Sequence, residues 1–95
     1  MASWYDKAVF YHIYPLGMLG APFVNTEDAA ADRFPELNQW VAHMEATGCT
    51  ALYIGPLFES SSHGYDTRNY RLADRRLGTN EGFRHFTRLC HEAGI

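Results

Sequence analysis

Ala51-Leu-Tyr-Ile-Gly-Pro-Leu-Phe58 is an apolar run that leads directly into Ser60-Ser-Ser-His-Gly-Tyr-Asp-Thr-Arg-Asn-Tyr70, a segment rich in polar and aromatic residues. The run predicts a buried strand over Thr50–Phe58. Pro56 marks the end of that strand, because proline has no N–H to donate to a sheet. The connection that follows, residues 57–78, is predicted to be a long loop. A buried strand that delivers polar and aromatic side chains onto a loop is how α/β proteins build binding sites.

An earlier segment predicts a first strand. Ala8-Val-Phe-Tyr-His-Ile-Tyr-Pro15 is short, aromatic and β-branched, which indicates a strand buried on both faces. His12 is its one clearly polar member, and we expect it to be a hydrogen-bonded core residue. The connection after this strand, residues 16–32, is long and rich in turn residues. It is predicted to contain a short helical piece over Thr26–Ala31.

Two helices follow the two predicted strands. The first spans Pro35–Thr47, with proline at its first position and Gly48 as its stop. The second begins after Thr79 as N-cap and ends at Gly94. Apolar residues recur at helical spacing on both helices. They are Phe34, Leu37, Val41 and Met44 with Trp40 alongside in the first, and Phe83, Phe86, Cys90 and Ala93 with Leu89 alongside in the second.

Composition indicates one small segment, residues 1–95, with a net charge of −3. Basic residues are scattered, so neither nucleic acid nor a membrane is expected as a partner. Cys49 and Cys90 lack the spacing of a zinc site and are expected to be buried thiols. We therefore predict no metal and no other cofactor. The N-terminus has the pattern of neither a signal peptide nor a membrane span, which makes the cytoplasm the expected compartment.

Strand, long loop, helix and glycine occur twice in this order. The order predicts an α/β fold with parallel strands, made of two βα units like those of a TIM (β/α)8 barrel. Ile95 has the character of the first residue of a third strand. Both long loops leave the carboxyl ends of the strands, which is the functional side of such barrels.

Several motifs in this frame are typical of one family. They are Ala8–Pro15 and Gly48–Pro56 at the two strands, His63–Tyr70 in the loop, and Arg76–Phe83 with His91–Ile95 at the ends of the second helix. In this order they resemble the start of the α-amylase family (glycoside hydrolase family 13). The Tyr-Asp-Thr form of the loop is most similar to cyclomaltodextrinase-like and neopullulanase-like members. The resemblance implies a partial TIM barrel from an enzyme that acts on α-glucosidic bonds.

The resemblance also implies roles for three loop residues. Tyr65 matches the tyrosine that stacks on the sugar next to the scissile bond, and His63 is its neighbour in the same cleft. Asp66 stands where members carry either Trp or Asp, so it either contacts sugar or orders the loop. Ser62 stands where members specialised for α-1,6 bonds often carry a carboxylate, which argues against that specificity.

Elementary chemistry agrees with a sugar site in this loop. Pyranose faces pack on aromatic rings, and sugar hydroxyls need polar partners. Tyr65 and Tyr70 offer rings, while Asp66, Arg68 and Asn69 offer polar groups. For Arg68 and Tyr70 we favour the simpler interpretation that they pair and pack to shape the loop.

Catalytic residues are not predicted in this chain. Retaining hydrolysis needs two carboxyl groups about 5–5.5 Å apart, and the family places its three catalytic carboxylates after the fourth, fifth and seventh strands. Glu59, Asp66 and Asp74 are not expected to form a substitute pair. Since a full barrel takes about 250 residues, we expect a natural, cloned or designed N-terminal fragment that is inactive alone. Its parent would be a retaining α-glucan hydrolase or transferase.

Two parallel strands with two helices leave one sheet face and both sheet edges uncovered. We therefore expect a homo-oligomer, a dimer or larger, with or without exchange of segments between copies. Two alternatives to the enzyme fragment stay open. One is a module that binds maltooligosaccharides weakly, and the other is a self-associating structural unit without a ligand.

Overall fold

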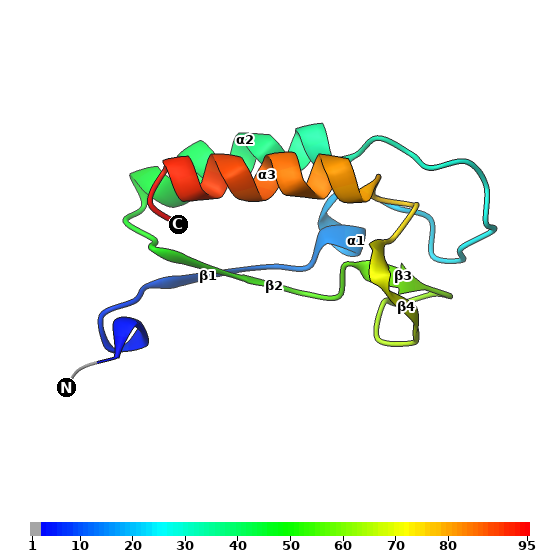
Figure 1. Cartoon of the computed structure of the whole chain (residues 1–95), viewed down its shortest axis with the longest axis horizontal. Helices are drawn as coiled ribbons and strands as arrows, with labels where there is room; N and C mark the ends of the chain where they lie inside the picture. The colour runs from blue at the N-terminus through cyan, green and yellow to red at the C-terminus, as the bar shows by residue number, and fades with distance from the viewer. Residues whose placement is uncertain (1–2) are drawn as a thin grey trace.

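Two strands with two helices packed on one face form the centre of the molecule (Figure 1). The structure, a computed structural model, describes residues 3–95. Its elements in chain order are the 3₁₀ turn η1 (Trp4–Asp6), β1 (Phe10–Ile13), α1 (Pro15–Met18), α2 (Phe34–Ala46), β2 (Ala51–Ile54), β3 (Phe58–Ser60), β4 (Thr67–Ala73) and α3 (Asn80–Glu92).

The central strands β1 and β2 are parallel. Phe10 lies beside Ala51, and the register continues to Ile13 beside Ile54. Because both strands run the same way, their carboxyl ends meet at one end of the molecule. The short helix α1 and the hairpin of β3 and β4 lie at that end (Figure 1). The predicted α/β order with a parallel pair is confirmed, and no closed barrel forms within residues 3–95.

Helices α2 and α3 begin and end close to their predicted limits. Thr79 caps α3, because its hydroxyl accepts a hydrogen bond from the N–H of Gly82 at 3.1 Å. Gly48 follows α2 with φ of 82°, the left-handed conformation that stops a helix. Within residues 3–95, no helix combines the length and the apolar character needed to cross a lipid bilayer.

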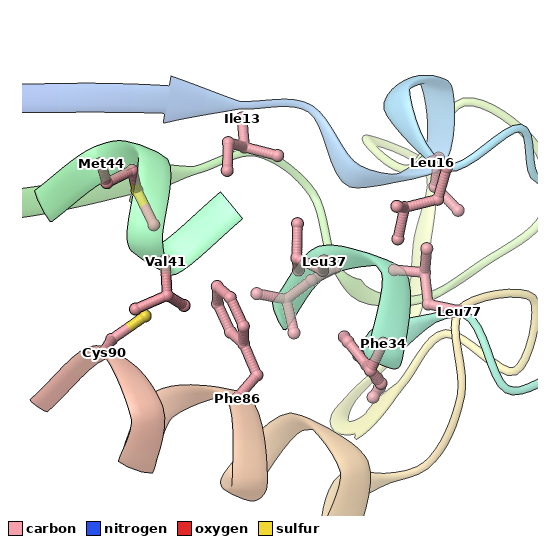
Figure 2. Close-up of a cluster of buried hydrophobic side chains, with 12 residues drawn as sticks. Ile13, Leu16, Phe34, Leu37, Val41, Met44, Leu77, Phe86 and Cys90 are labelled. Atoms are coloured by element: carbon pink, nitrogen blue, oxygen red, sulfur yellow. The ribbon is translucent and has the colours of Figure 1, made fainter. Parts of the chain in front are cut away.

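The core lies between these helices and the sheet. Figure 2 shows apolar side chains from both helices meeting side chains from β1, α1 and the segment before α3. The four residues predicted for the apolar face of α2 are all buried. The labelled core residues are Ile13, Leu16, Phe34, Leu37, Val41, Met44, Leu77, Phe86 and Cys90.

The prediction that β1 is buried on both faces is wrong. Only Ile13 of the strand is buried, and Phe10 is 51% exposed. His12 is exposed as well, so it is not a core residue. Its ring packs against that of Tyr53, with ring centres 4.9 Å apart. The reason is that α2 and α3 cover a single face of the sheet. We call the other side, which carries Phe10, His12 and Tyr53, the open face.

Two predictions about the connections are also wrong. Residues 26–31 form no helix, because Asn25 Oδ1 accepts from the N–H of Glu27 at 3.0 Å and Glu27 has φ of 64°. The helix in this connection is α1 instead, which starts at Pro15 directly after β1. The predicted loop over residues 57–78 contains an antiparallel hairpin of β3 and β4, with two irregularities in its register.

Both cysteines are free thiols. Cys90 is buried as predicted, and burial raises the pKa of its thiol. Cys49 is only half-buried, with its Sγ 3.4 Å from the hydroxyl of Thr47. In the part of the chain that the structure describes, no three His, Cys, Asp or Glu side chains are grouped so that they could hold a metal ion.

Candidate functional site

The predicted site residues His63, Tyr65 and Asp66 lie on the turn between β3 and β4. Tyr65 is 75% exposed, and its ring centre lies 6.0 Å from that of His63. The backbone N–H of Tyr65 donates to His63 Nδ1 at 3.1 Å, which holds the two rings side by side. The structure therefore brings two of the three residues together as an exposed aromatic surface.

Asp66 directs its carboxylate back onto the same turn. The hydroxyl of Ser62 donates to Asp66 Oδ2 at 2.6 Å, and the N–H of Gly64 donates to Oδ1 at 3.2 Å. The hydrogen bond from Ser62 is the largest cause that lowers the pKa of Asp66 to about 2. Its Oδ1 also lies 3.7 Å from His63 Nδ1. These contacts support the alternative in which Asp66 orders the turn.

Three further contacts fix the shape of the turn. Gly64 has φ of 103°, and a Cβ there would lie 2.6 Å from the Cβ of Pro56, so the position requires glycine. The hydroxyl of Tyr14 donates to the carbonyl of His63, and the hydroxyl of Thr67 donates to the carbonyl of Gly64 at 3.2 Å. The turn is thereby tied to the ends of both central strands.

A buried ion pair that sequence reasoning missed lies beneath the turn. Asp74 is 0% exposed and Arg76 is 5% exposed. Arg76 Nε and Nη2 donate to the two carboxylate oxygens of Asp74, each at 2.9 Å. Burial alone would raise the pKa of Asp74, but the hydrogen bonds and charge of Arg76 outweigh it and lower that pKa. Ser60 completes the pair, since its hydroxyl and its N–H both donate to Asp74 Oδ2 at 3.1 Å.

A second ionic cluster surrounds Glu59, which is also buried. Arg75 donates to it twice, from Nε at 2.7 Å and from the backbone N–H at 3.0 Å. Arg68 lies 3.7 Å from the same carboxylate and pairs with Glu27. Arg68 therefore joins the hairpin to the first long connection, which supports its predicted role in shaping the loop. Tyr70 packs against Phe58 with ring centres 5.9 Å apart.

The three carboxylates near the turn are all engaged in contacts within the protein. Glu59 and Asp74 are buried and paired with arginine, and Asp66 is bound to its own turn. None of the three is a free carboxylate facing solvent beside a second one. These three carboxylates are therefore not arranged as the nucleophile and acid pair that retaining glycoside hydrolysis requires.

The chain is similar to known proteins over its full length. Residues 22–95 match the family described as "Alpha amylase, catalytic domain". Oligo-1,6-glucosidase of Heyndrickxia coagulans is 30% identical over 97 residues, and neopullulanase 2 of Thermoactinomyces vulgaris is 32% identical over 109 residues. These alignments cover 100% and 98% of this chain.

Solved structures agree with these relatives. The cyclic α-maltosyl-(1→6)-maltose hydrolase of Arthrobacter globiformis superposes with a TM-score of 0.75 at 30% identity, over 97% of this chain and 24% of that one. The isomaltulose synthase of Protaminobacter rubrum superposes with a TM-score of 0.77 at 26% identity, over 100% of this chain and 16% of that one. The chain spans 17% of the glucosidase and 19% of the neopullulanase. It belongs to the α-amylase family of glycoside hydrolases and has the fold of part of that family's TIM-barrel catalytic domain.

Proposed function

We propose that this chain supplies one wall of an α-glucan-binding cleft, and that Tyr65 is the main contact with the sugar. The relatives include a glucosidase, a neopullulanase and a hydrolase of a cyclic maltosyl-maltose, so the proposed ligand is a maltooligosaccharide. The parent activity would be hydrolysis or transfer at α-glucosidic bonds, with His63 beside Tyr65 and Asp66 ordering the turn.

One observation carries this proposal. Tyr65 is 75% exposed although its backbone is held by the contacts of the turn with His63, Gly64 and Asp66. A large ring kept in solvent by an ordered backbone is placed to meet a partner. It also lies at the carboxyl ends of parallel strands, where proteins of this fold bind their ligands.

Maltotriose titration of the 95-residue chain tests the role of Tyr65. Tyr65→Ala should weaken binding about tenfold, equivalent to about 1.4 kcal/mol, because the ring that stacks on the sugar is lost. Tyr70→Ala is the matched control, since Tyr70 is also a tyrosine of the hairpin and is 73% exposed. Equal affinities for Tyr65→Ala and the unmodified chain would remove Tyr65 from the site.

We further propose that these 95 residues alone do not hydrolyse α-glucans. Support comes from the carboxylates, because Glu59 and Asp74 are bound to arginine and Asp66 to Ser62. Incubation with maltodextrin or cyclodextrin, followed by a reducing-sugar assay, should show no release of sugar. Measurable hydrolysis that survives purification would contradict this proposal.

A second function is favoured by the open face. Phe10 and Tyr53 are exposed there although they belong to the central sheet. We propose that copies of this chain associate through this face as a homo-oligomer, since exposed apolar sheet surface drives association.

A further inference from the structure

Arg76 contacts two connections that are far apart in the sequence. Its Nη1 lies 2.9 Å from the carbonyl oxygens of both Pro22 and Phe23, which belong to the connection after β1. The same nitrogen lies 2.7 Å from the carbonyl oxygen of Ser62, in the turn that carries Tyr65. One guanidinium group thus joins the two segments that leave the carboxyl ends of the central strands.

The other nitrogens of the guanidinium anchor it from below. Nε and Nη2 form a two-pronged pair with Asp74, and Nη2 also donates to the hydroxyl of Ser60 at 2.9 Å. A planar fork with five N–H donors suits this set of acceptors, whereas a lysine ammonium has three donors at one point. The position of the guanidinium is therefore fixed before any ligand arrives.

Contacts continue from Arg76 to the exposed rings. Arg76 holds the carbonyl of Ser62, the hydroxyl of Ser62 donates to Asp66, and Asp66 accepts from the N–H of Gly64. Tyr65 lies between Gly64 and Asp66 in the chain. Two hydrogen bonds in series thus link Arg76 to Asp66, directly after Tyr65, and a third extends the link to Gly64, directly before it.

We propose that Arg76 is a positioning residue for the sugar-binding turn, which it holds in the shape that presents Tyr65. It touches no ligand itself and acts through Ser62 and Asp66. This inference rests on the proposed function for its link to sugar, but the ordering of the turn can be measured without any sugar.

Amide hydrogen exchange followed by mass spectrometry tests the inference on the full chain, monomeric or associated. In Arg76→Lys, the amides of residues 61–66 should exchange about tenfold faster, while those of α3 keep their protection. Arg75→Lys is the matched control, because Arg75 is the adjacent arginine and pairs with a different buried carboxylate, Glu59. It should leave residues 61–66 unchanged. Unchanged exchange at 61–66 in a folded Arg76→Lys would overturn the inference.

Two additions keep the test decisive. If Arg76→Lys does not fold, Ser60→Ala is the second variant: it removes one acceptor of Arg76 Nη2 and one donor to Asp74, and it leaves the ion pair of Arg76 with Asp74 in place. Ser60→Ala should accelerate amide exchange at residues 61–66 by less than the factor expected for Arg76→Lys. Exchange at these amides that is unchanged in Ser60→Ala would equally overturn the inference. Maltotriose affinity should fall about tenfold in Arg76→Lys and stay constant in Arg75→Lys. If the unmodified chain does not bind maltotriose, the proposed function fails, while the exchange result still decides the role of Arg76.

Discussion

Asp66 owes its lowered pKa mainly to one hydroxyl group. The hydrogen bond from Ser62, at 2.6 Å, is the largest cause that lowers the pKa from its ordinary value of 3.8 to about 2. Because the folded pKa lies below the unfolded one, the ionised carboxylate stabilises the folded turn at pH values above about 4. This contribution is lost as the pH falls from 3.8 toward 2. Acid in this pH range should therefore loosen the turn.

Ser62→Ala should raise the pKa of Asp66 toward 3.8, because the carboxylate loses its strongest donor. An NMR titration of the Asp66 carboxyl carbon measures this shift. Ser61→Ala serves as control, since Ser61 is the exposed neighbour whose backbone carbonyl accepts from the N–H of Asn25 at 3.0 Å. A pKa that stays near 2 in Ser62→Ala would mean that the backbone N–H groups alone are enough to lower the pKa of Asp66.

The candidate site shows which side-chain roles a sequence can reveal. Tyr65, His63 and Asp66 were identified as a group because their types and order resemble a family motif. The buried pair of Asp74 and Arg76 was missed because an Asp-x-Arg spacing does not itself show whether the two side chains are buried or meet. Besides Asp74, the main hydrogen-bond acceptors of Arg76 are backbone carbonyl groups, which every residue has. Nothing in the sequence marks which carbonyls a distant arginine will reach.

Helix α3 depends on its first turn. Thr79 Oγ1 accepts from the N–H of Gly82, one of the helix donors that has no partner within the helix. Thr79→Ala should therefore lower the free energy of unfolding by about 1 kcal/mol. Urea unfolding followed by circular dichroism, at one fixed protein concentration, measures the change.

Thr87→Ala is the control for this substitution. Thr87 lies in the middle of α3, and its hydroxyl donates to the carbonyl of Arg84, which is already within the helix. Alanine is the better helix former, so this variant should be as stable as the unmodified chain or slightly more stable. Equal destabilisation by both substitutions would argue that the effect comes from lost packing, and that the cap itself contributes little.

The elements differ in how far their sequence could predict them. Helix α2 repeats apolar residues every three or four positions, so its extent and its buried face were predicted almost completely. The hairpin was missed because six of the seven residues of β4 are not buried, and only Ala73 is. Such a strand shows no alternation of buried and exposed residues from which it could be predicted. Its partner β3 has only three residues. Pairing between these strands depends on the tertiary contacts of Glu59 and Asp74.

The molecule is more extended than a compact domain of its length. Its radius of gyration is 14.0 Å, whereas a compact domain of this length has about 12.4 Å. The molecule measures 45 × 26 × 20 Å, so the larger radius reflects an elongated shape. Besides the open face, an apolar groove of about 300 Å³ lies between β2 and α3, lined by Leu52, Phe86 and Ile95 among others. The ring centre of Trp4 lies 5.9 Å from that of Phe10, but Trp4 remains exposed. Apolar surface of this extent is normally covered by further protein.

Replacing Phe10 and Tyr53 together by serine should shift the chain from oligomer toward monomer at micromolar concentration. The reason is that these two rings are exposed apolar groups on the open face, where Phe10 is 51% and Tyr53 62% exposed. Sedimentation velocity measures the shift. Tyr70→Ser, which removes a still more exposed ring from the hairpin, should leave the oligomer intact. A folded monomer formed by the unmodified chain at this concentration would refute association, and the single layer formed by α2 and α3 would then suffice to stabilise a sheet with one uncovered face.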